Sequence, residues 1–231
     1  IGGASRHLAR RFRAAVTGIT LSPLQAKRAT EMSAEEDCDF RVQDALGTFP
    51  ATWRDKHDLV WSLESGEHMP NKPAFVDNLV RTCKPGGNVV LVTWCHRDLE
   101  KNESNLRLHE RLLLGTINKC YYLPKWCSVA DYVQLFEDRG MQNLQRADWT
   151  QQIAPFWPAV IQTAARPRNF IRLLRTGVDG LRSALAMVLM CLGYRIGLIR
   201  FGLITCQKQL LPTTIQPGVD GLLPGGVKPS S

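Results

Sequence analysis

Several features that would place a chain in a well-defined class are missing from this sequence. Its seven cysteines, at positions 38, 83, 95, 120, 127, 191 and 206, include no Cys-x-x-Cys pair. An odd number of cysteines without that spacing argues against both a disulfide framework and a zinc site. We therefore expect reduced, mostly packed thiols, no metal, and a reducing compartment.

Long apolar runs are also absent. The longest extends from Ser183 to Tyr194, which is shorter than the roughly 18 residues that a membrane-spanning helix requires. Arg182 and Arg195 flank this run, and no secretory signal is visible at the start of the chain. The sequence therefore predicts a protein that does not span a bilayer.

Acidic residues are in short supply, with 21 Asp and Glu against 29 Lys and Arg. Much of the basic excess lies between Arg166 and Arg200, where it is mixed with apolar residues. Because the interleaved aromatic residues of a nucleic-acid-binding module are missing, we expect no nucleic acid partner. Two interpretations of the charge are left, which are simple solubility and attraction to an anionic membrane surface.

The composition is that of a folded domain, since 44% of the 231 residues are hydrophobic and 22% are charged. Strand-like segments at 14–20, 39–42, 57–62 and 88–94 alternate with helix-like segments, and this order predicts an α/β fold with a mostly parallel sheet. Two late strands, at 141–149 and 198–207, are separated by a helical, Arg-rich insertion at 155–194, which predicts an antiparallel edge. We assign residues 1–208 to the domain and the Pro- and Gly-rich residues 209–231 to a disordered tail.

Local signals predict where two helices begin. Ser22 can cap a helix in which Pro23 takes the first position and Gln25 completes a capping box. Ser128 can cap another helix in the same way, with Asp131 as its third residue. In both helices, the capping side chains would accept hydrogen bonds from the backbone N–H groups of the first turn and so fix where the helix begins.

Two predicted strands end abruptly in polar residues. Glu64, Glu67 and His68 follow the strand at 57–62, and His96 and Arg97 follow the strand at 88–94. Open α/β sheets bind ligands outside the carboxyl ends of their strands, so these residues predict a cleft. The alternatives are a structural His68 that bridges its loop, and a salt-bridge cluster of His96 and Arg97 with Asp98 and Glu100.

Longer stretches of the chain resemble a known family. They are WSLESGEHMP (61–70), VTWCHRDL (92–99), YYLPKWCS (121–128) and APFWPAVI (154–161), preceded by Gly2-Gly3 and GITLSPLQ (18–25). Together they resemble the tocopherol methyltransferases, a branch of the class I S-adenosylmethionine-dependent methyltransferases. Plant indole-alkaloid N-methyltransferases share much of the same sequence, so the resemblance indicates the chemistry more firmly than the substrate.

The resemblance implies a Rossmann-like class I methyltransferase sheet from which the first strand is missing. In the family that strand lies centrally, between the segments that correspond to residues 14–20 and 57–62. Neighbouring strands lie about 4.8 Å apart, so we expect either a gap one strand wide or direct pairing of the flanking strands. We also expect a fragment of a longer gene product that binds its cofactor weakly.

The resemblance also implies which residues bind S-adenosylmethionine. Glycines let the backbone approach the methionine end, a hydroxyl and an amide hold the ribose diol, and a carboxylate accepts from the adenine amino group. The residues are Gly2, Gly3, Thr20, Leu21, Ser22, Gln25, Asp44, Ala45, Ser62 and Leu63. From the residues alone, Ser22 and Gln25 are explained equally well as a capping box, and Asp44 as a turn residue.

The activity implied is methyl transfer to the chromanol ring carbon of γ- or δ-tocopherol. His68 is the first choice of general base, Glu67 assists it, and Glu64 is the third candidate. The alternatives are a methyltransferase of the same family that acts on another amphiphile, such as an indole alkaloid nitrogen, and an inactive fragment.

The partners implied are a prenylated phenolic lipid and a peripheral membrane surface. The corresponding location is the plastid, at the envelope or a lipid droplet, with the transit peptide outside this chain. Aromatic and aliphatic residues could line a pocket for the prenyl tail or simply form core. They are Trp126, Trp149, Phe156, Trp157 and residues 184–192.

Overall fold

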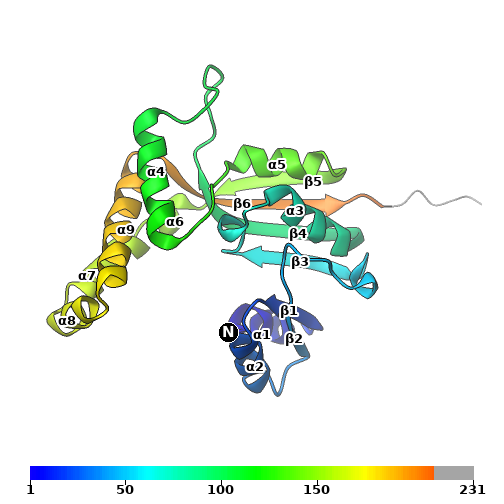
Figure 1. The fold of residues 1–231 in the computed structure, drawn as a ribbon. Helices are drawn as coiled ribbons and strands as arrows, with labels where there is room; N and C mark the ends of the chain where they lie inside the picture. The colour runs from blue at the N-terminus through cyan, green and yellow to red at the C-terminus, as the bar shows by residue number, and fades with distance from the viewer. Residues whose placement is uncertain (211–231) are drawn as a thin grey trace, which may run out of the picture.

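The computed structural model describes residues 1–210, except for the side chains of residues 170, 172 and 174 (Figure 1). The predicted disordered tail lies outside the described residues from position 211 onward. Within residues 1–210, no helix combines the length and the apolar character needed to cross a membrane. Strands and helices alternate along the described chain, as an α/β fold requires.

Residues 1–42 form a small unit around a two-stranded parallel sheet. Helix α1 (Gly3–Phe12), strand β1 (Val16–Thr20), helix α2 (Pro23–Glu31) and strand β2 (Cys38–Val42) follow one another. The ring of Phe40 fills the space beside Gly2 and Gly18, where an added Cβ would come within 2.6 Å and 2.7 Å of it. The apolar run at 14–20 predicts a strand buried in the sheet, in line with the mostly parallel sheet expected from the sequence. This is wrong, because β1 has one strand neighbour among residues 1–210 and is mostly half-buried.

The main sheet has four strands in the spatial order β3 (His57–Leu63), β4 (Cys83–His96), β6 (Ile199–Lys208) and β5 (Met141–Asp148). Strand β3 is parallel to β4, whereas β6 is antiparallel to both of its neighbours. The predicted antiparallel pairing at the edge is therefore present. The antiparallel strand is β6, and it lies between β4 and the edge strand β5.

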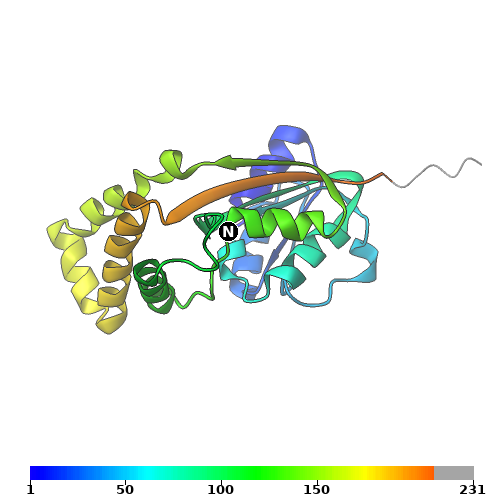
Figure 2. The same ribbon diagram turned by 90° about the horizontal axis from the view of Figure 1, so that it is seen from above.

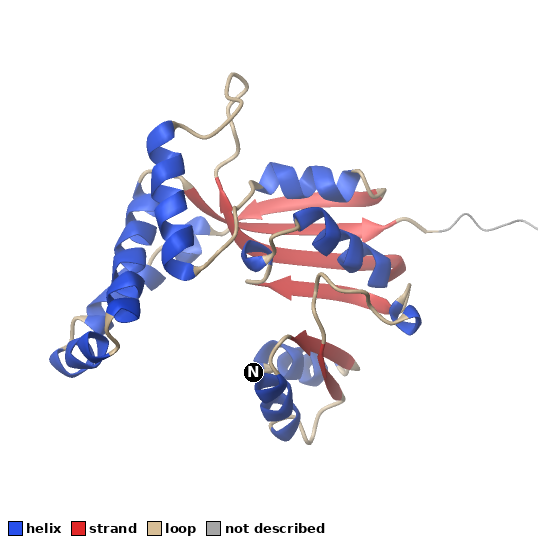
Figure 3. Cartoon of the chain, viewed as in Figure 1, coloured by secondary structure: helices blue, strands red, loops and turns tan. Residues whose placement is uncertain are grey.

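The two sheets are separate, as Figure 3 shows by the two groups of strands. Among residues 1–210, β1 and β3 do not pair, so the structure has the gap rather than the direct pairing of flanking strands. Strand β3 is consequently an edge strand. Its side chains Leu59, Trp61 and Leu63 are 42%, 41% and 44% exposed, although the central position of β3 in the family's sheet would bury them.

Two apolar clusters stabilise the main sheet. Helices α3 (Lys72–Thr82) and α5 (Val129–Glu137) pack on one face over residues such as Leu91, Phe136 and Ile204, which are fully or almost fully buried. Helices α4 (Leu108–Tyr121) and α9 (Val178–Arg195) pack on a second cluster that includes Trp94 and Phe201. Ser128 and Asp131 form the predicted capping box at the start of α5.

The predicted helical insertion between the last two strands is confirmed. It consists of α6 (Thr150–Ile153), α7 (Phe156–Ala164), α8 (Pro167–Arg175) and α9. Both views show α4 and α7–α9 extending beyond one end of the main sheet (Figures 1 and 2). Two short 3₁₀ helices, η1 (Ala51–Trp53) and η2 (Gly66–His68), flank β3.

Candidate functional site

The turn after β3 holds the three residues predicted to be catalytic. Glu64 adopts a left-handed conformation with φ of 52°, which is uncommon for a residue with a side chain and costs of order 1–3 kcal/mol. Its backbone N–H donates to the carbonyl of Val92 at 2.8 Å. That bond ties the end of β3 to β4 and lets the chain turn into η2.

A buried lysine holds this turn in place. The Nζ atom of Lys72, at the start of α3, donates to the carbonyl oxygens of Gly66 and Met69, each at 2.7 Å, and lies 3.4 Å from that of Glu67. Lys72 is only 8% exposed, and burial lowers its pKa. One buried ammonium group thus holds the backbone of η2 in place through hydrogen bonds to its carbonyl groups.

The two predicted catalytic partners in η2 point to different surroundings. The Glu67 side chain is 4% exposed, and its Oε2 accepts a hydrogen bond of 2.5 Å from Thr93 in β4. The His68 ring is 60% exposed, with Nε2 3.9 Å from Glu67 Oε1. Glu67 therefore anchors the turn within reach of the imidazole, while His68 is open to a reactant from solvent.

Glu64 and Ser62 complete the polar edge of β3. Burial and the neighbouring charge of Glu67 raise the pKa of Glu64. The hydroxyl of Ser62 is buried and has no hydrogen-bond partner within residues 1–210, whereas Leu63 is exposed. A buried hydroxyl without a partner is unusual in a folded protein, so Ser62 has capacity left for a ligand or water.

The end of β1 forms a second polar edge. The Thr20 hydroxyl donates to Gln25 Oε1 at 2.9 Å and accepts from the backbone N–H of Ser22 at 3.2 Å. Ser22 caps α2 and Pro23 takes the first turn, as predicted. The capping box itself is incomplete, because the Gln25 side chain bonds Thr20 instead of the Ser22 backbone. Thr20 and Gln25 are thus brought together as the resemblance requires, beside an exposed Leu21.

Asp44 lies next to this edge. The N–H of Gln43 donates to the carbonyl of Thr20 at 3.0 Å, which places the chain after β2 beside the end of β1. Asp44 Oδ1 accepts from the N–H of Leu46 at 2.9 Å, so Asp44 does form the turn that was its alternative role. One carboxylate oxygen accepts there, and the other has no hydrogen-bond donor within residues 1–210. The Ala45 N–H has no acceptor within residues 1–210.

Asn78 links helix α3 to the turn that follows β2. Its amide, from α3, donates to the carbonyls of Ala45 at 2.9 Å and Gly47 at 3.0 Å. The turn after β2 is thereby fixed to the helix that follows the η2 turn. Sequence reasoning missed Asn78, because an amide in the middle of an amphipathic helix gives no local signal of a distant partner.

Gly2 and Gly3 lie at the start of α1. Gly2 is the N-cap, with φ of 65°, and makes no side-chain cap, so N–H groups of the first helical turn are free to bind a ligand. An added Cβ at Gly3 would meet nothing within 4 Å. Open space beside free N–H groups fits the role predicted for these glycines.

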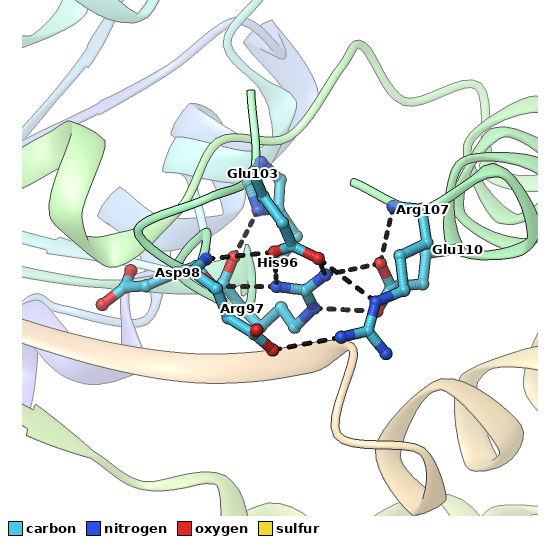
Figure 4. A network of polar contacts seen from close by, with 7 residues as sticks. His96, Arg97, Asp98, Glu103, Arg107 and Glu110 are labelled. Carbon is cyan, nitrogen blue, oxygen red and sulfur yellow. Dashed lines mark hydrogen bonds and ion pairs between the residues drawn. The ribbon is translucent and has the colours of Figure 1, made fainter. Parts of the chain in front are cut away.

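A polar network closes the carboxyl end of β4 (Figure 4). Arg97 donates to Glu110 at 2.8 Å through both Nε and Nη2, and to Glu103 at 2.6 Å and 2.9 Å. These bonds hold the pKa of Glu103 down to about 2 and raise that of Arg97. The prediction that Arg97 belongs to a salt-bridge cluster is correct, but the carboxylates predicted to pair with it are not. Glu100 pairs with Arg107, and Asp98 pairs with Arg146.

Of the four aromatic residues predicted to line a pocket, Trp126 and Trp157 pack in the core, whereas Trp149 and Phe156 are exposed. Trp94 contacts Trp157, Tyr194 and Phe201, with ring centroids 4.7–6.0 Å apart, and Trp126 is 7% exposed. Trp149 is 38% exposed and Phe156 is 53% exposed. An apolar hollow of about 600 Å³ lies between α7 and α8, lined by Phe156, Ala159, Val160, Thr163, Leu173 and Thr176.

The arrangement fits S-adenosylmethionine, the cofactor that the resemblance implies. Its methionine end needs donors such as the free N–H groups at Gly3, its ribose needs paired donors and acceptors such as Thr20 and Gln25, and its adenine needs an acceptor such as Asp44. Within residues 1–210, no group of three or more His, Cys, Asp or Glu side chains could hold a metal ion.

Comparison with known proteins agrees with this chemistry. The family described as "Methyltransferase domain" matches residues 1–91. The chain is 50% identical over 215 residues to the chloroplastic tocopherol O-methyltransferase of Arabidopsis thaliana, covering 91% of this chain and 61% of the relative. It is 32% identical to norajmaline N-methyltransferase of Rauvolfia serpentina, covering 90% of this chain and 72% of the relative.

A solved structure shows the same fold. The geranyl diphosphate C-methyltransferase of Streptomyces coelicolor A3(2) superposes with a TM-score of 0.69 at 20% identity, over 90% of this chain and 67% of that protein. The chain spans about three fifths of the length of the two tocopherol methyltransferases that it matches. Because norajmaline N-methyltransferase is 32% identical to this chain and is matched over 72% of its own length, the chain belongs to the class I S-adenosylmethionine-dependent methyltransferases.

Proposed function

We propose that this protein transfers a methyl group from S-adenosylmethionine to the chromanol ring carbon of γ- or δ-tocopherol. The observation that carries the proposal is the 50% identity to a tocopherol methyltransferase over 91% of the chain. The matching proteins from Arabidopsis thaliana and Oryza sativa are both named chloroplastic, which supports a plastid location.

The cofactor would lie across the ends of β1, β2 and β3. The N–H groups at Gly2 and Gly3 would bind its methionine end, Thr20 and Gln25 its ribose, and Asp44 its adenine, with Leu21, Ser22, Ala45, Ser62 and Leu63 beside them. When bound, S-adenosylmethionine supplies an electrophilic methyl group on a positively charged sulfur. The chain supplies position, and correct alignment of reacting atoms is worth roughly 7–11 kcal/mol in favourable cases.

The residues of the η2 turn would activate the phenol. His68 Nε2 takes the proton of the chromanol hydroxyl, which raises the electron density at the ortho carbon that accepts the methyl group. The ring carbon then loses its own proton to water, and the phenolate oxygen regains a proton from His68, which restores the aromatic phenol. Glu67 stabilises the imidazolium from 3.9 Å, and Glu64, with its raised pKa, is the reserve base.

A prenylated substrate also needs apolar surface. The hollow between α7 and α8 has apolar walls and a volume of about 600 Å³, which is within the usual range for a ligand pocket. We assign the prenyl tail to it. We also place the protein at the surface of the plastid envelope or a lipid droplet, where such a lipid resides.

A second candidate is methylation of another amphiphile, such as an indole alkaloid nitrogen. The observation that favours it is the 32% identity to an alkaloid N-methyltransferase. A third is an inactive protein, which is favoured by the gap between β1 and β3, since a divided sheet weakens the alignment of the two edges of the cofactor site.

Methyl transfer from labelled S-adenosylmethionine to γ-tocopherol, δ-tocopherol and an indole amine separates the first two candidates. We expect labelled tocopherol carrying the new methyl group on carbon. A methyl ether would refute the ring-carbon assignment, and labelled amine alone would favour the second candidate. Calorimetry with S-adenosylhomocysteine tests the third, because absence of both heat and turnover identifies an inactive chain.

A further inference from the structure

Helix α9 carries an apolar stripe that the other residues of the described range 1–210 leave exposed. We define the stripe as six residues spaced three or four apart, which places them on one helix face. They are 45% to 71% exposed, and they are Val178, Leu181, Leu185, Val188, Leu192 and Ile196. The opposite face of α9 is the packed one, with Gly180, Ala186, Met190 and Gly193 buried.

The surroundings of the stripe are strongly basic. Residues 155–200 contain seven arginines and one acidic residue, Asp179. Arg182 and Arg200 are partly neutralised by Asp179 and Asp148. Four other arginines are exposed and form no ion pair within the described part of the chain, and they are Arg166, Arg168, Arg175 and Arg195.

This combination of charge and apolar surface selects the kind of partner. Soluble monomers rarely leave so continuous an apolar patch in water. A second copy of the same surface would bring its arginines against these, and like charges facing one another disfavour association. A lipid surface with anionic headgroups instead offers an apolar layer for the stripe and phosphates for the arginines.

We infer that the α9 stripe lies in the interfacial layer of an anionic membrane, with α9 parallel to the surface and the four arginines at the level of the lipid phosphates. The inference rests on the proposed function for the identity of the lipid substrate. Phe156 in α7 and Ile171 in α8 are also exposed, at 53% and 50%. Phe156 also lines the apolar hollow, so a tail leaving the bilayer would reach the hollow without crossing water.

Co-sedimentation with vesicles tests this inference on the full chain. The vesicles contain phosphatidylcholine alone or phosphatidylcholine mixed with phosphatidylglycerol. The variant is Leu185→Asp with Val188→Asp. The matched control is Leu108→Asp with Leu112→Asp, which adds the same charge at two exposed leucines of α4, 69% and 63% exposed. Circular dichroism confirms that both fold.

We expect the unmodified chain and the control to bind the anionic vesicles, and the α9 variant to bind about 100-fold more weakly. We expect Arg166→Gln with Arg168→Gln to weaken binding about tenfold and to reduce its dependence on salt. Equal binding of the α9 variant and the control would overturn the inference. So would equal binding of the unmodified chain to neutral vesicles, or a dimer that the α9 variant alone dissociates.

Methyl transfer to γ-tocopherol dispersed in uncharged detergent micelles, where no anionic membrane is present, keeps the two proposals apart. The α9 variant should retain that activity, since the stripe faces away from the packed side of the helix. If the unmodified chain lacks it, the proposed function fails, while the vesicle result still decides the role of the stripe.

Discussion

Replacing Lys72 by Met removes the ammonium group that holds the η2 turn while keeping a side chain of similar length. The hydrogen bonds show how large the effect should be. The carbonyl of Gly66 keeps a partner, because the Met69 N–H donates to it at 3.1 Å. The carbonyl of Met69 loses the one donor it has within residues 1–210. A half-buried acceptor without a partner costs about 1–3 kcal/mol.

We therefore expect Lys72→Met to lower the free energy of unfolding by about 1–3 kcal/mol, with no change in the m-value. The turn also positions His68, and displacing a catalytic group by about 1 Å can lower the reaction rate about 100-fold. We expect kcat for methyl transfer to fall about 10- to 100-fold, with KM changing much less.

Urea unfolding followed by tryptophan fluorescence measures the first effect, and single-turnover kinetics measures the second. Lys84→Met is the matched control, because Lys84 pairs with Asp58 at the surface and surface pairs contribute about 0–1 kcal/mol. If Lys72→Met and Lys84→Met behave alike in both assays, Lys72 does not hold the η2 turn.

Three further predictions follow from the same sites. His68→Ala should lower kcat by about 10²–10⁴ with unchanged affinity for S-adenosylhomocysteine in calorimetry, and unchanged turnover would exclude His68 as the base. Glu103→Gln should destabilise the protein above pH 4.5, the ordinary pKa of Glu. The difference should disappear as pH falls from there to about 2, because Arg97 lowers the folded-state pKa of Glu103 to about 2. Thermal unfolding across this range measures it, and a constant difference would refute the pairing. Gly2→Ala should weaken the binding of S-adenosylhomocysteine at least tenfold, since Phe40 occupies the space at 2.6 Å and φ is positive; unchanged binding would exclude the glycine from the cofactor site.

The sequence predicts the elements of the fold well where local signals are strong. Ser22, Pro23, Ser128 and the Arg-rich insertion all act through neighbours close in the chain, and the structure confirms them. Helix α4, in contrast, runs from Leu108 to Tyr121, and its last turn is stabilised by Ile117, which is buried in the cluster that includes Trp94 and Met190. No local pattern encodes that contact.

Only part of the candidate site is predicted, because the sequence shows local signals but not contacts between distant residues. The strand ends of β1 and β3 are visible as polar residues after apolar runs. The groups that fix them are not, since Lys72, Thr93 and Asn78 look like ordinary residues of a helix or strand. Their roles depend on partners that the fold brings near: Thr93 lies 26 residues from Glu67 and Asn78 lies 33 residues from Ala45. The catalytic assignment of His68, Glu67 and Glu64 stays a prediction.

The divided sheet has a consequence for how the molecule opens. Backbone pairing does not link residues 1–42 to the main sheet, and the bonds from Asn78 and Arg81 to the segment between them are few. Amide hydrogens of the N-terminal unit should therefore exchange through a local opening of lower free energy than those of β4 and β6. A nucleoside bound at Gln25 and Ser62 would span both units, and protection of the first should rise with its concentration.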